Sequence, residues 1–530
     1  MENEKKDINL FTRLIHGGHV PDILDCIANL SSDEVFTPPD LVDKILDLFP
    51  EEIWRDSTLK WLDPACKTGI FLRQIAKRLM EGLRDEFPNE EERREHIFHN
   101  MLYGIALTDL TALMSRRSLY TSKSANSEKS IAEFASPEGN ISYDNRPHTY
   151  VNGSCKYCGN KEGSELDRDE SRERHAYNFI HLTEEEAKNM KFDVIVGNPP
   201  YQLSDGGFGA SAMPIYQLFV EQAKRLEPHY MAFIIPSRWF TGGKGIDKFR
   251  DEMLKDRHVK ELVDFPSSSD CFPGVDIPGG VCYFVRDSKY IGKTRIKTYN
   301  GETIVNNSER YLDDGNAGIF IRYSQMISVL KKVQSLHEIT MDTIISSQKP
   351  YGLRTDFFVN PEKYDLPPIF DHENEVHSTS IKIYGLNRGK RIEKYVPIDY
   401  PLPSGREYIE GYKIFIPSAN GCKAIGEGEP TPVLGSPILA EKFSACTETF
   451  LRIGSWNSKE EAKNALTYLK TKFFRFLVGI KKTTQHTSKE TYSMVPMLDF
   501  HEEWTDEKLF ERYDITPEEQ DYIKSMIKEM

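Results

Sequence analysis

The sequence predicts an α/β protein with a mostly parallel sheet, followed by a smaller α+β domain. Short apolar runs typical of strands alternate with stretches whose apolar residues recur at helical spacing, as at 214–226. Such alternation is typical of parallel sheets in which helices connect the strands. The chain has 530 residues, of which 39% are hydrophobic and 28% charged, which is ample for a large buried core.

Six segments carry the strand pattern of a short apolar run bounded by turn residues. They are residues 59–62, 101–107, 192–197, 230–236, 260–265 and 279–285. Pro64 and Gly69 mark a turn after the first of them. Ile75, Leu79 and Leu83 then recur at helical spacing. Ligands bind at the carboxyl ends of the strands in such sheets, so the turns after the first and third strands are candidate site segments.

The pattern changes along the chain and predicts three parts. Residues 1–300 hold the alternating strands and helices and form the expected first domain. The alternation fades after about residue 300, so residues 301–500 are assigned to a second domain and residues 501–530 to a helical tail. A polar stretch between the second and third strands is too long for a plain crossover, which predicts an insertion at about 145–185.

The charge is unevenly distributed, although the formal net charge is −14. Residues 331–500 carry 23 Lys and Arg against 20 Asp and Glu, whereas residues 1–330 carry 41 against 52. A local basic surface attracts phosphate groups even on an acidic molecule. Basic and aromatic residues interleave in the 331–500 block, which favours DNA binding over the alternative of solvated faces. The candidate DNA-binding residues are Arg388, Lys390, Arg391, Lys481 and Lys482.

The third strand ends in Asn198-Pro-Pro-Tyr201, which places a carboxamide, a rigid turn and an aromatic ring side by side. The exocyclic amino group of a nucleobase is a poor nucleophile because its lone pair is delocalised into the ring. The Asn198 side-chain oxygen and the Pro199 carbonyl can accept hydrogen bonds from both N–H groups and localise that lone pair. Tyr201 offers a face on which a flipped base can stack. The alternative is an ordinary turn and a surface aromatic residue.

Three motifs in order resemble the amino-methyltransferases of restriction–modification systems that modify adenine in DNA. They are FTPPDLVDKILDLF from Phe36, DPACKTGIFL from Asp63 and the NPPY motif. Their order is similar to the gamma arrangement of TaqI-like enzymes, over about residues 31–285. The resemblance implies a Rossmann-like sheet that binds S-adenosylmethionine and a C-terminal target-recognition domain. It also implies base flipping and methyl transfer to the 6-amino group of adenine.

The same resemblance implies further site residues. The segment from 270 to 285 is similar to the family segment that carries a second aromatic residue against the flipped base, which points to Phe272, although a core position is the alternative. For Asp63 the alternative is a helix cap. The implied cofactor-binding residues are Thr37, Pro38, Asp63, Ala65, Gly69 and Phe71.

Two positions depart from the family pattern. Lys67 stands where the family has Gly, and Ala106 stands where the family has an acidic residue for the cofactor ribose. Loss of that carboxylate removes a charge-assisted hydrogen bond of about 1.5–3 kcal/mol. Asp109, Thr108 or Lys67 is therefore expected to replace it, unless the cofactor binds weakly.

Cys155 and Cys158 form a CxxC pair inside the predicted insertion, with histidines on both sides. Two thiolates and two imidazoles suit a tetrahedral structural zinc. The predicted ligands are His148, Cys155, Cys158 and His175, with His181 as the substitute for His175. The alternative is a pair of reduced cysteines in a loop.

The sequence-based expectation is therefore a site-specific adenine DNA methyltransferase in restriction–modification or phage defence. Its expected partners are double-stranded DNA and a cognate restriction endonuclease. A degenerate methylase that only binds DNA, and a protein glutamine methyltransferase, are the alternatives. No apolar run reaches the roughly 18 residues of a membrane helix, and no signal-peptide pattern is present. We therefore expect a bacterial or archaeal cytoplasmic protein, associated with the nucleoid and with no membrane partner.

Overall fold

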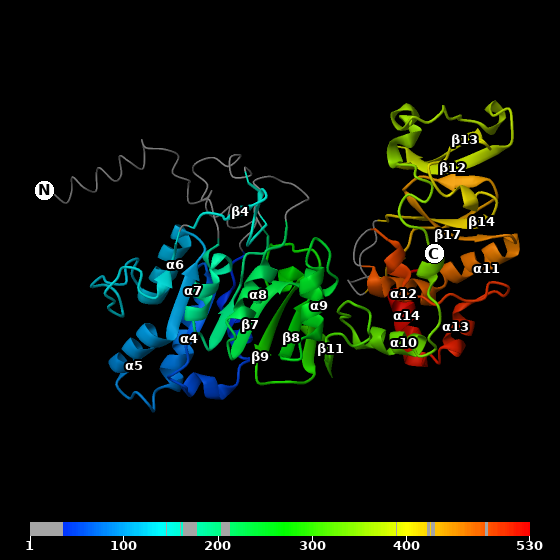
Figure 1. Cartoon of the computed structure of the whole chain (residues 1–530). Helices are drawn as coiled ribbons and strands as arrows, with labels where there is room; N and C mark the ends of the chain where they lie inside the picture. The colour runs from blue at the N-terminus through cyan, green and yellow to red at the C-terminus, as the bar shows by residue number, and fades with distance from the viewer. Residues whose placement is uncertain are drawn as a thin grey trace. The chain divides into compact units, whose positions relative to one another are not determined.

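The computed structural model of the chain divides into two compact units, which meet in sequence between Leu312 and Asp313 (Figure 1). It describes residues 35–144, 146–159, 161–162, 177–202, 213–387, 389–420, 425, 430–482 and 486–530. Each unit has its own buried core. Within the described ranges, no helix has the length and apolarity that crossing a membrane requires.

The first unit is built on one large sheet, which confirms the predicted α/β class. Within the described residues it has nine strands in the order β11-β10-β8-β9-β7-β6-β1-β2-β3. Their bounds are β1 Trp61–Cys66, β2 Leu102–Ala106, β3 Ile141–Ser142, β6 Val194–Gly197, β7 Tyr230–Pro236, β8 Val259–Phe265, β9 Val281–Asp287, β10 Thr294–Asn300 and β11 Thr303–Arg310. The central strands β2, β1, β6 and β7 are parallel, whereas β9 runs antiparallel between β7 and β8.

The six predicted strand segments correspond to β1, β2, β6, β7, β8 and β9. The first strand extends further than predicted, because it continues through Pro64 to Cys66. Proline lacks an N–H donor, and the register with β2 shifts between Asp63 and Cys66. The strand therefore continues across its proline through a local irregularity rather than a turn.

The helices of the first unit lie between the strands. Their bounds are α3 Pro39–Leu46, α4 Ile70–Gly82, α5 Glu90–His96, α6 Asp109–Tyr120, α7 Glu184–Asn189, α8 Tyr216–Arg225 and α9 Asp247–Lys255. The β1–α4 turn needs a glycine, since Gly69 has a φ of +70° and a Cβ there would lie 3.0 Å from the Cα of Ser115. This close approach fixes the loop that precedes α4 against α6.

The predicted insertion contains a small hairpin of β4 (Tyr150–Val151) and β5 (Ser154–Cys155), which Figure 1 shows above the large sheet. The short 3₁₀ helix η3, Asn178–His181, follows later in the chain and packs against α8, where Phe179 stacks on Phe219 at 5.9 Å. The insertion is thereby attached to the helix that follows the NPPY motif.

The second unit combines two three-stranded sheets with helices. The sheets have the orders β13-β12-β16 and β15-β14-β17. The strands are β12 Ser380–Asn387, β13 Lys390–Pro397, β14 Tyr412–Pro417, β15 Ile438–Ala440, β16 Ser444–Cys446 and β17 Phe450–Trp456. The helices are α10 Ser324–Gln334, α11 Lys459–Lys470, α12 Lys472–Lys481, α13 Asp506–Arg512 and α14 Pro517–Met526.

Two predicted boundaries differ from the units of the structure. The strand β11 lies beyond residue 300 and pairs antiparallel with β10, so the first unit ends at Leu312 rather than at 300. Residues 501–530 are part of the second unit rather than a separate tail. Leu509 and Ile523 are fully buried in the cluster that also holds Phe473 of α12.

Candidate active site at the carboxyl edge of the sheet

The turns after β1 and β6 lie side by side, because the two strands are parallel neighbours. A pocket lies between them and the segment before α3. It is lined by Phe36, Thr37, Asp63, Ala65, Lys67, Thr68, Gly69, Ile70, Phe71 and Asn198. The structure thus brings five of the six implied cofactor residues together with Asn198. Pro38 precedes α3 outside this lining.

The Asn198 side chain is held in one orientation. Its amide nitrogen donates to the backbone oxygen of Val35 at 2.9 Å and to the hydroxyl oxygen of Thr37 at 3.0 Å. Because both partners accept hydrogen bonds, the carboxamide group must direct its nitrogen at them and its oxygen away from them. The Asn198 side-chain oxygen is buried and accepts no hydrogen bond from any described residue. The Asn198 oxygen is therefore a fixed hydrogen-bond acceptor in the pocket lining, and no described residue donates to it.

The two predicted stacking rings are buried in this structure. Tyr201 is 5% exposed and Phe272 is 2% exposed. Burial raises the pKa of Tyr201 well above its ordinary value. The backbone oxygen of Tyr201 accepts from the Ile215 N–H at 3.2 Å, which ties the NPPY motif to the start of α8. Stacking of a base on either ring therefore requires the side chains around it to move.

Asp63 is a buried carboxylate within β1, directly before Pro64. Burial raises its pKa from 3.8 to about 6, while the hydrogen bond from Ala65 and the charge of Lys67 oppose that rise. The Ala65 N–H donates to its Oδ1 at 3.0 Å. Gly197 permits this packing, since a Cβ there would lie 2.9 Å from the same oxygen. A perturbed carboxyl group in a pocket is a candidate functional group.

The strand β2 ends at Ala106, whose methyl side chain offers no hydrogen-bond acceptor to a ribose. Ala106 is buried, with 1% exposure. The Thr108 hydroxyl accepts from the Thr111 N–H at 3.0 Å and thereby caps α6. Asp109 is exposed in the first turn of that helix. Of these candidates for the ribose, Thr108 is occupied as a helix cap, whereas Asp109 presents its carboxylate to solvent.

Four side chains of the insertion form a separate cluster. His148, Cys155, Cys158 and His181 each place a ligand atom so that all four atoms lie within 4.8 Å of one another. The Cys155 sulfur is 3.5 Å from Nε2 of His181, and the Cys158 sulfur is 3.4 Å from Nδ1 of His148. His181, the substitute ligand of the sequence prediction, is the second histidine of this cluster. His175 lies outside the described residues.

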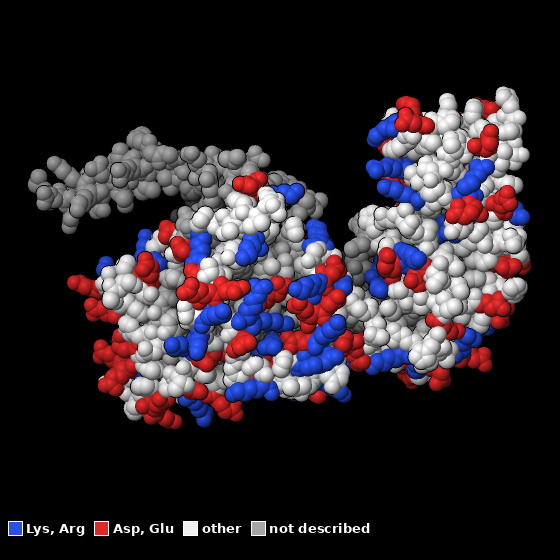
Figure 2. All heavy atoms as spheres, viewed as in Figure 1, with Lys and Arg blue, Asp and Glu red and all other residues white. Residues whose placement is uncertain are grey.

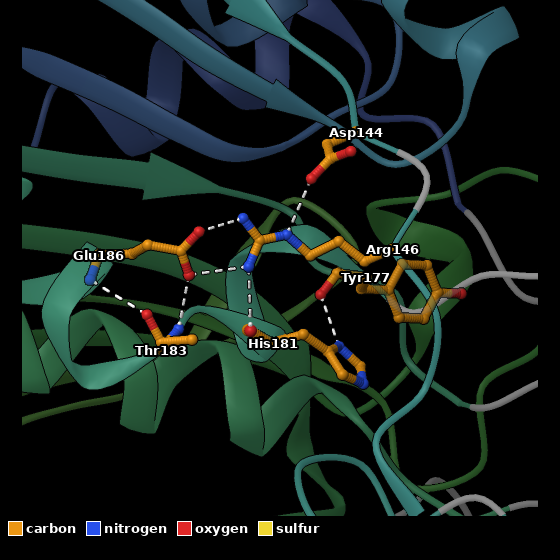
Figure 3. Close-up of polar contacts among 6 residues, drawn as sticks. All are labelled: Asp144, Arg146, Tyr177, His181, Thr183 and Glu186. Atoms are coloured by element: carbon orange, nitrogen blue, oxygen red, sulfur yellow. Dashed lines mark hydrogen bonds and ion pairs between the residues drawn. The ribbon is translucent and has the colours of Figure 1, made fainter.

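The ring of His181 is oriented by its surroundings (Figure 3). Its Nδ1 lies 2.7 Å from the backbone oxygen of Tyr177, so Nδ1 carries the proton and Nε2 faces Cys155. Arg146 donates to the backbone oxygen of His181 at 3.2 Å and pairs with Glu186 and Asp144. This network joins the chain on both sides of the cluster and fixes the imidazole.

The candidate DNA-binding residues fall in two different environments. Lys390 and Arg391 are exposed on β13, and the Arg391 guanidinium lies 5.7 Å from the Phe450 ring centroid. Lys481 donates to the Ser493 hydroxyl at 2.8 Å. Lys482 is 3% exposed, so it is not placed to contact phosphate in this structure. Arg388 lies outside the described residues.

Charges of both signs are mixed on the surface that Figure 2 shows. In the first unit, Asp and Glu gather around α5, whose first turn holds three glutamates. In the second unit, Lys and Arg lie near β12 and β13 with carboxylates beside them. Lys382 of β12, for example, pairs with Glu393 of β13 at 3.0 Å. The exposed end of this hairpin, with Lys390 and Arg391, therefore carries the basic charge that the sequence pattern emphasised.

Sequence reasoning missed Val35 entirely. Its backbone oxygen accepts from both Asn198 and Lys67, and a backbone acceptor leaves no residue-type signal. Phe36 of the pocket lining was quoted in the motif but given no role. The motif order nevertheless predicted that this segment would cover the pocket.

Comparisons with known proteins match parts of the chain to methylases. Residues 100–272 match the Eco57I restriction-modification methylase family. An uncharacterized adenine-specific methylase of Mycoplasma pneumoniae is 42% identical over 305 residues, which are 52% of this chain and 72% of that protein.

Solved structures are similar at lower identity. A modification subunit of a putative type I restriction enzyme from Vibrio vulnificus is 16% identical, with a TM-score of 0.31, over 56% of this chain and 50% of that chain. The type ISP enzyme LlaGI, in complex with a DNA substrate mimic, is 12% identical, with a TM-score of 0.47, over 92% of this chain and 46% of that chain. The chain thus spans about half the length of these two proteins.

Replacing Asp63 by Asn should stabilise the ligand-free protein at neutral pH. The folded-state pKa is raised from 3.8 to about 6, so ionised Asp63 destabilises the fold fully above about pH 6 and ever less as the pH falls toward 4. Asn keeps the acceptor for Ala65 and removes the charge. We expect the free energy of unfolding to rise by about 1–3 kcal/mol at pH 8, measured by urea unfolding.

The gain should shrink as the pH is lowered toward 4.5, because Asp63 is then protonated in the folded wild type. Asp109→Asn is the matched control, since that carboxylate is exposed, and it should change stability little at either pH. An Asp63→Asn variant that is less stable than wild type at pH 8 would contradict the expectation.

Proposed function

Because the chain belongs to the adenine-specific methylase family, we propose that it methylates the 6-amino group of adenine at specific sites in DNA. The observation that carries this proposal is the buried side-chain oxygen of Asn198, which the network of Val35 and Thr37 holds without a donor. An exocyclic amine supplies the N–H donor that this oxygen lacks. The proposed setting is a restriction–modification or phage-defence system.

Asn198 and Pro199 are proposed to act together on the amine. The Asn198 oxygen accepts one N–H and the Pro199 carbonyl accepts the other, which shifts the nitrogen toward tetrahedral geometry and makes its lone pair available. Both acceptors follow a fully buried strand, so they need little reorganisation during the reaction. The hydrogen bonds from the Asn198 nitrogen to Val35 and Thr37 keep the oxygen directed at the substrate.

The target adenine is proposed to reach this site by base flipping. A base inside a duplex cannot present its amino group to a pocket, so such enzymes rotate the nucleotide out of the stack. Tyr201 and Phe272 would stack on the flipped base. Their burial in this structure means that the base must displace neighbouring side chains as it enters.

The pocket residues fit S-adenosylmethionine, which is proposed as the methyl donor. Asp63 offers a carboxylate to the ammonium of the methionine moiety, and Gly69 lines the same pocket. Thr37 comes from the segment before α3 and Phe71 from the first turn of α4, and both line the pocket. When bound, this cofactor supplies the electrophilic methyl group, while the chain holds the amine.

Zinc is proposed as a structural cofactor of the insertion. Tetrahedral zinc with Cys and His ligands places sulfur and nitrogen atoms about 3.6 Å apart. The two measured sulfur–nitrogen pairs are 3.5 Å and 3.4 Å. The neutral His181 that metal binding requires is favoured because burial lowers its pKa to about 4, and its Nδ1–H is held by a backbone carbonyl, as is usual for a histidine that binds a metal.

DNA recognition is proposed for the second unit, with double-stranded DNA as substrate and a restriction endonuclease as partner. Lys390 and Arg391 are the exposed basic residues on β13 that support this assignment. Contacts to phosphate set position and affinity, whereas a few side chains read the bases. The burial of Lys482 leaves the β12–β13 hairpin as the better supported surface.

Asn198→Ala should lower the rate of methyl transfer about 100-fold or more, because one preorganised acceptor is removed. Affinity for S-adenosylmethionine and for DNA should change little, so the loss should appear in kcat. Turnover of tritiated methyl groups into duplex DNA measures it. Tyr201→Phe, which keeps the ring, is the control and should retain turnover. Wild-type kcat in Asn198→Ala would refute the assigned role.

Protein purified under reducing conditions without chelator should carry about one zinc per chain. Elemental analysis of two variants then identifies the fourth ligand. His181→Ala should lose the metal, whereas His175→Ala should keep it, because His181 is the histidine within ligand distance of Cys155. Cys155→Ser should also lose it, and Cys446→Ala, which changes a thiol of the second unit, is the control. Zinc-free wild type would remove the proposal.

Reversing the charge of Lys390 and Arg391 together should weaken DNA binding and flatten its salt dependence. The slope of log K against log salt should fall by about one unit for each phosphate group that the protein no longer neutralises. A Lys463→Glu, Lys508→Glu double variant has the same change in net charge at exposed lysines elsewhere in the unit. The proposal for this hairpin fails if both double variants change affinity and slope equally.

A further inference from the structure

A buried ammonium lies in the candidate cofactor pocket, and the proposed methylase function leaves it without a role. Lys67 is 6% exposed and belongs to the loop between β1 and α4. Its side chain lines the pocket together with Thr37, Asp63 and Asn198.

The position of this ammonium is fixed from two sides. The Lys67 Nζ donates to the backbone oxygen of Val35 at 3.1 Å. The Lys67 backbone oxygen accepts from the Ser115 hydroxyl at 3.2 Å, which holds the loop against α6. The Lys67 ammonium therefore lies on the side of the pocket that the segment before α3 forms. A lysine that served solubility would project into solvent instead.

Two opposite charges therefore line one small pocket. The charge of Lys67 lowers the pKa of Asp63, although burial outweighs it and leaves that pKa at about 6. Burying a charge costs free energy unless the charge is paired or bonded. A pocket that keeps both a cation and a carboxylate is suited to a ligand with the complementary pair of charges.

The α-amino-acid end of S-adenosylmethionine carries such a pair, an ammonium and a carboxylate on one carbon. We propose that the Lys67 Nζ binds the carboxylate of this end while Asp63 binds its ammonium. This inference rests on the proposed function and extends it, because it assigns the cofactor carboxylate to Lys67. Charge-assisted hydrogen bonds of this kind are stronger than neutral ones.

A simpler role for Lys67 would be a clamp between the β1–α4 loop and Val35. A clamp supports the binding of any ligand in the pocket, whatever charges that ligand carries. A carboxylate-binding residue instead acts on ligands that have the carboxylate. Decarboxylated S-adenosylmethionine separates the two roles, because it keeps the adenosine, the sulfonium and the ammonium and lacks the carboxylate alone.

The experiment is calorimetric titration of the full chain with S-adenosylmethionine and with its decarboxylated form. Wild type should bind S-adenosylmethionine about tenfold more tightly or better, as expected for a charge-assisted hydrogen bond. In Lys67→Met, the affinity for S-adenosylmethionine should fall by the same factor, while the affinity for the decarboxylated form should stay within about twofold. The preference between the two ligands should thus disappear.

Lys67→Arg keeps the charge and should keep part of the preference, whereas Lys67→Gln should lose it as Met does. Circular dichroism of each variant checks the fold. If Lys67→Met fails to fold, Lys67→Gln replaces it in the comparison. Equal affinity of the wild type for both ligands would overturn the proposal and leave the proposed function standing.

Two further outcomes complete the test. If Lys67→Met lowers the affinity for both ligands by the same factor, Lys67 is a clamp and the proposal is wrong. If the wild type binds neither ligand, both this inference and the proposed methyltransferase activity fall. A preserved preference in all three variants would assign the carboxylate to another group and would also overturn it.

Discussion

One backbone carbonyl holds the candidate active site together. The oxygen of Val35 accepts from the Asn198 amide nitrogen and from the Lys67 ammonium, at 2.9 Å and 3.1 Å. A carbonyl oxygen has two lone pairs, so it can serve both donors. The segment before α3, the turn after β1 and the turn after β6 are thereby fixed to one atom. That acceptor, together with the Thr37 hydroxyl, orients the Asn198 side chain, and it also binds the Lys67 ammonium.

The sequence predicted those parts of the fold that local patterns encode. Buried strands such as β6 and β7 appear as short apolar runs, and the motifs mark the turns that follow them. The extent of the first unit was not predictable in this way. The strand β11 carries mostly exposed residues at the edge of the sheet, so its pattern resembles a surface loop, and its pairing with β10 is a tertiary property.

The candidate sites also combine features that local sequence patterns encode with features that only the tertiary structure determines. The residue types of Asn198, Asp63 and the CxxC pair carry their chemistry in the sequence, and the structure places them where that chemistry is possible. The choice between His175 and His181, and the role of Val35, depend on which groups approach one another in space. In the proposed zinc site the CxxC motif supplies two ligands, His148 before it supplies a third, and His181 supplies the fourth from a 3₁₀ helix more than twenty residues later, at Asn178–His181.

A shifted pKa does not by itself identify a functional group in this protein. Lys413 in the second unit is fully buried, and burial lowers its pKa to about 7. Its ammonium, however, is bonded to the backbone oxygens of Ile409 and Ser444, at 3.1 Å and 2.9 Å. Such a lysine joins β14 to its neighbours and is a structural group. Asp63 differs because its raised pKa coincides with a pocket, with a second charge at Lys67 and with the unsatisfied oxygen of Asn198. A buried carboxyl group with a raised pKa, a second buried charge and an unsatisfied oxygen each cost stability. Such groups gathered in one pocket are typical of a binding site and not of a hydrophobic core.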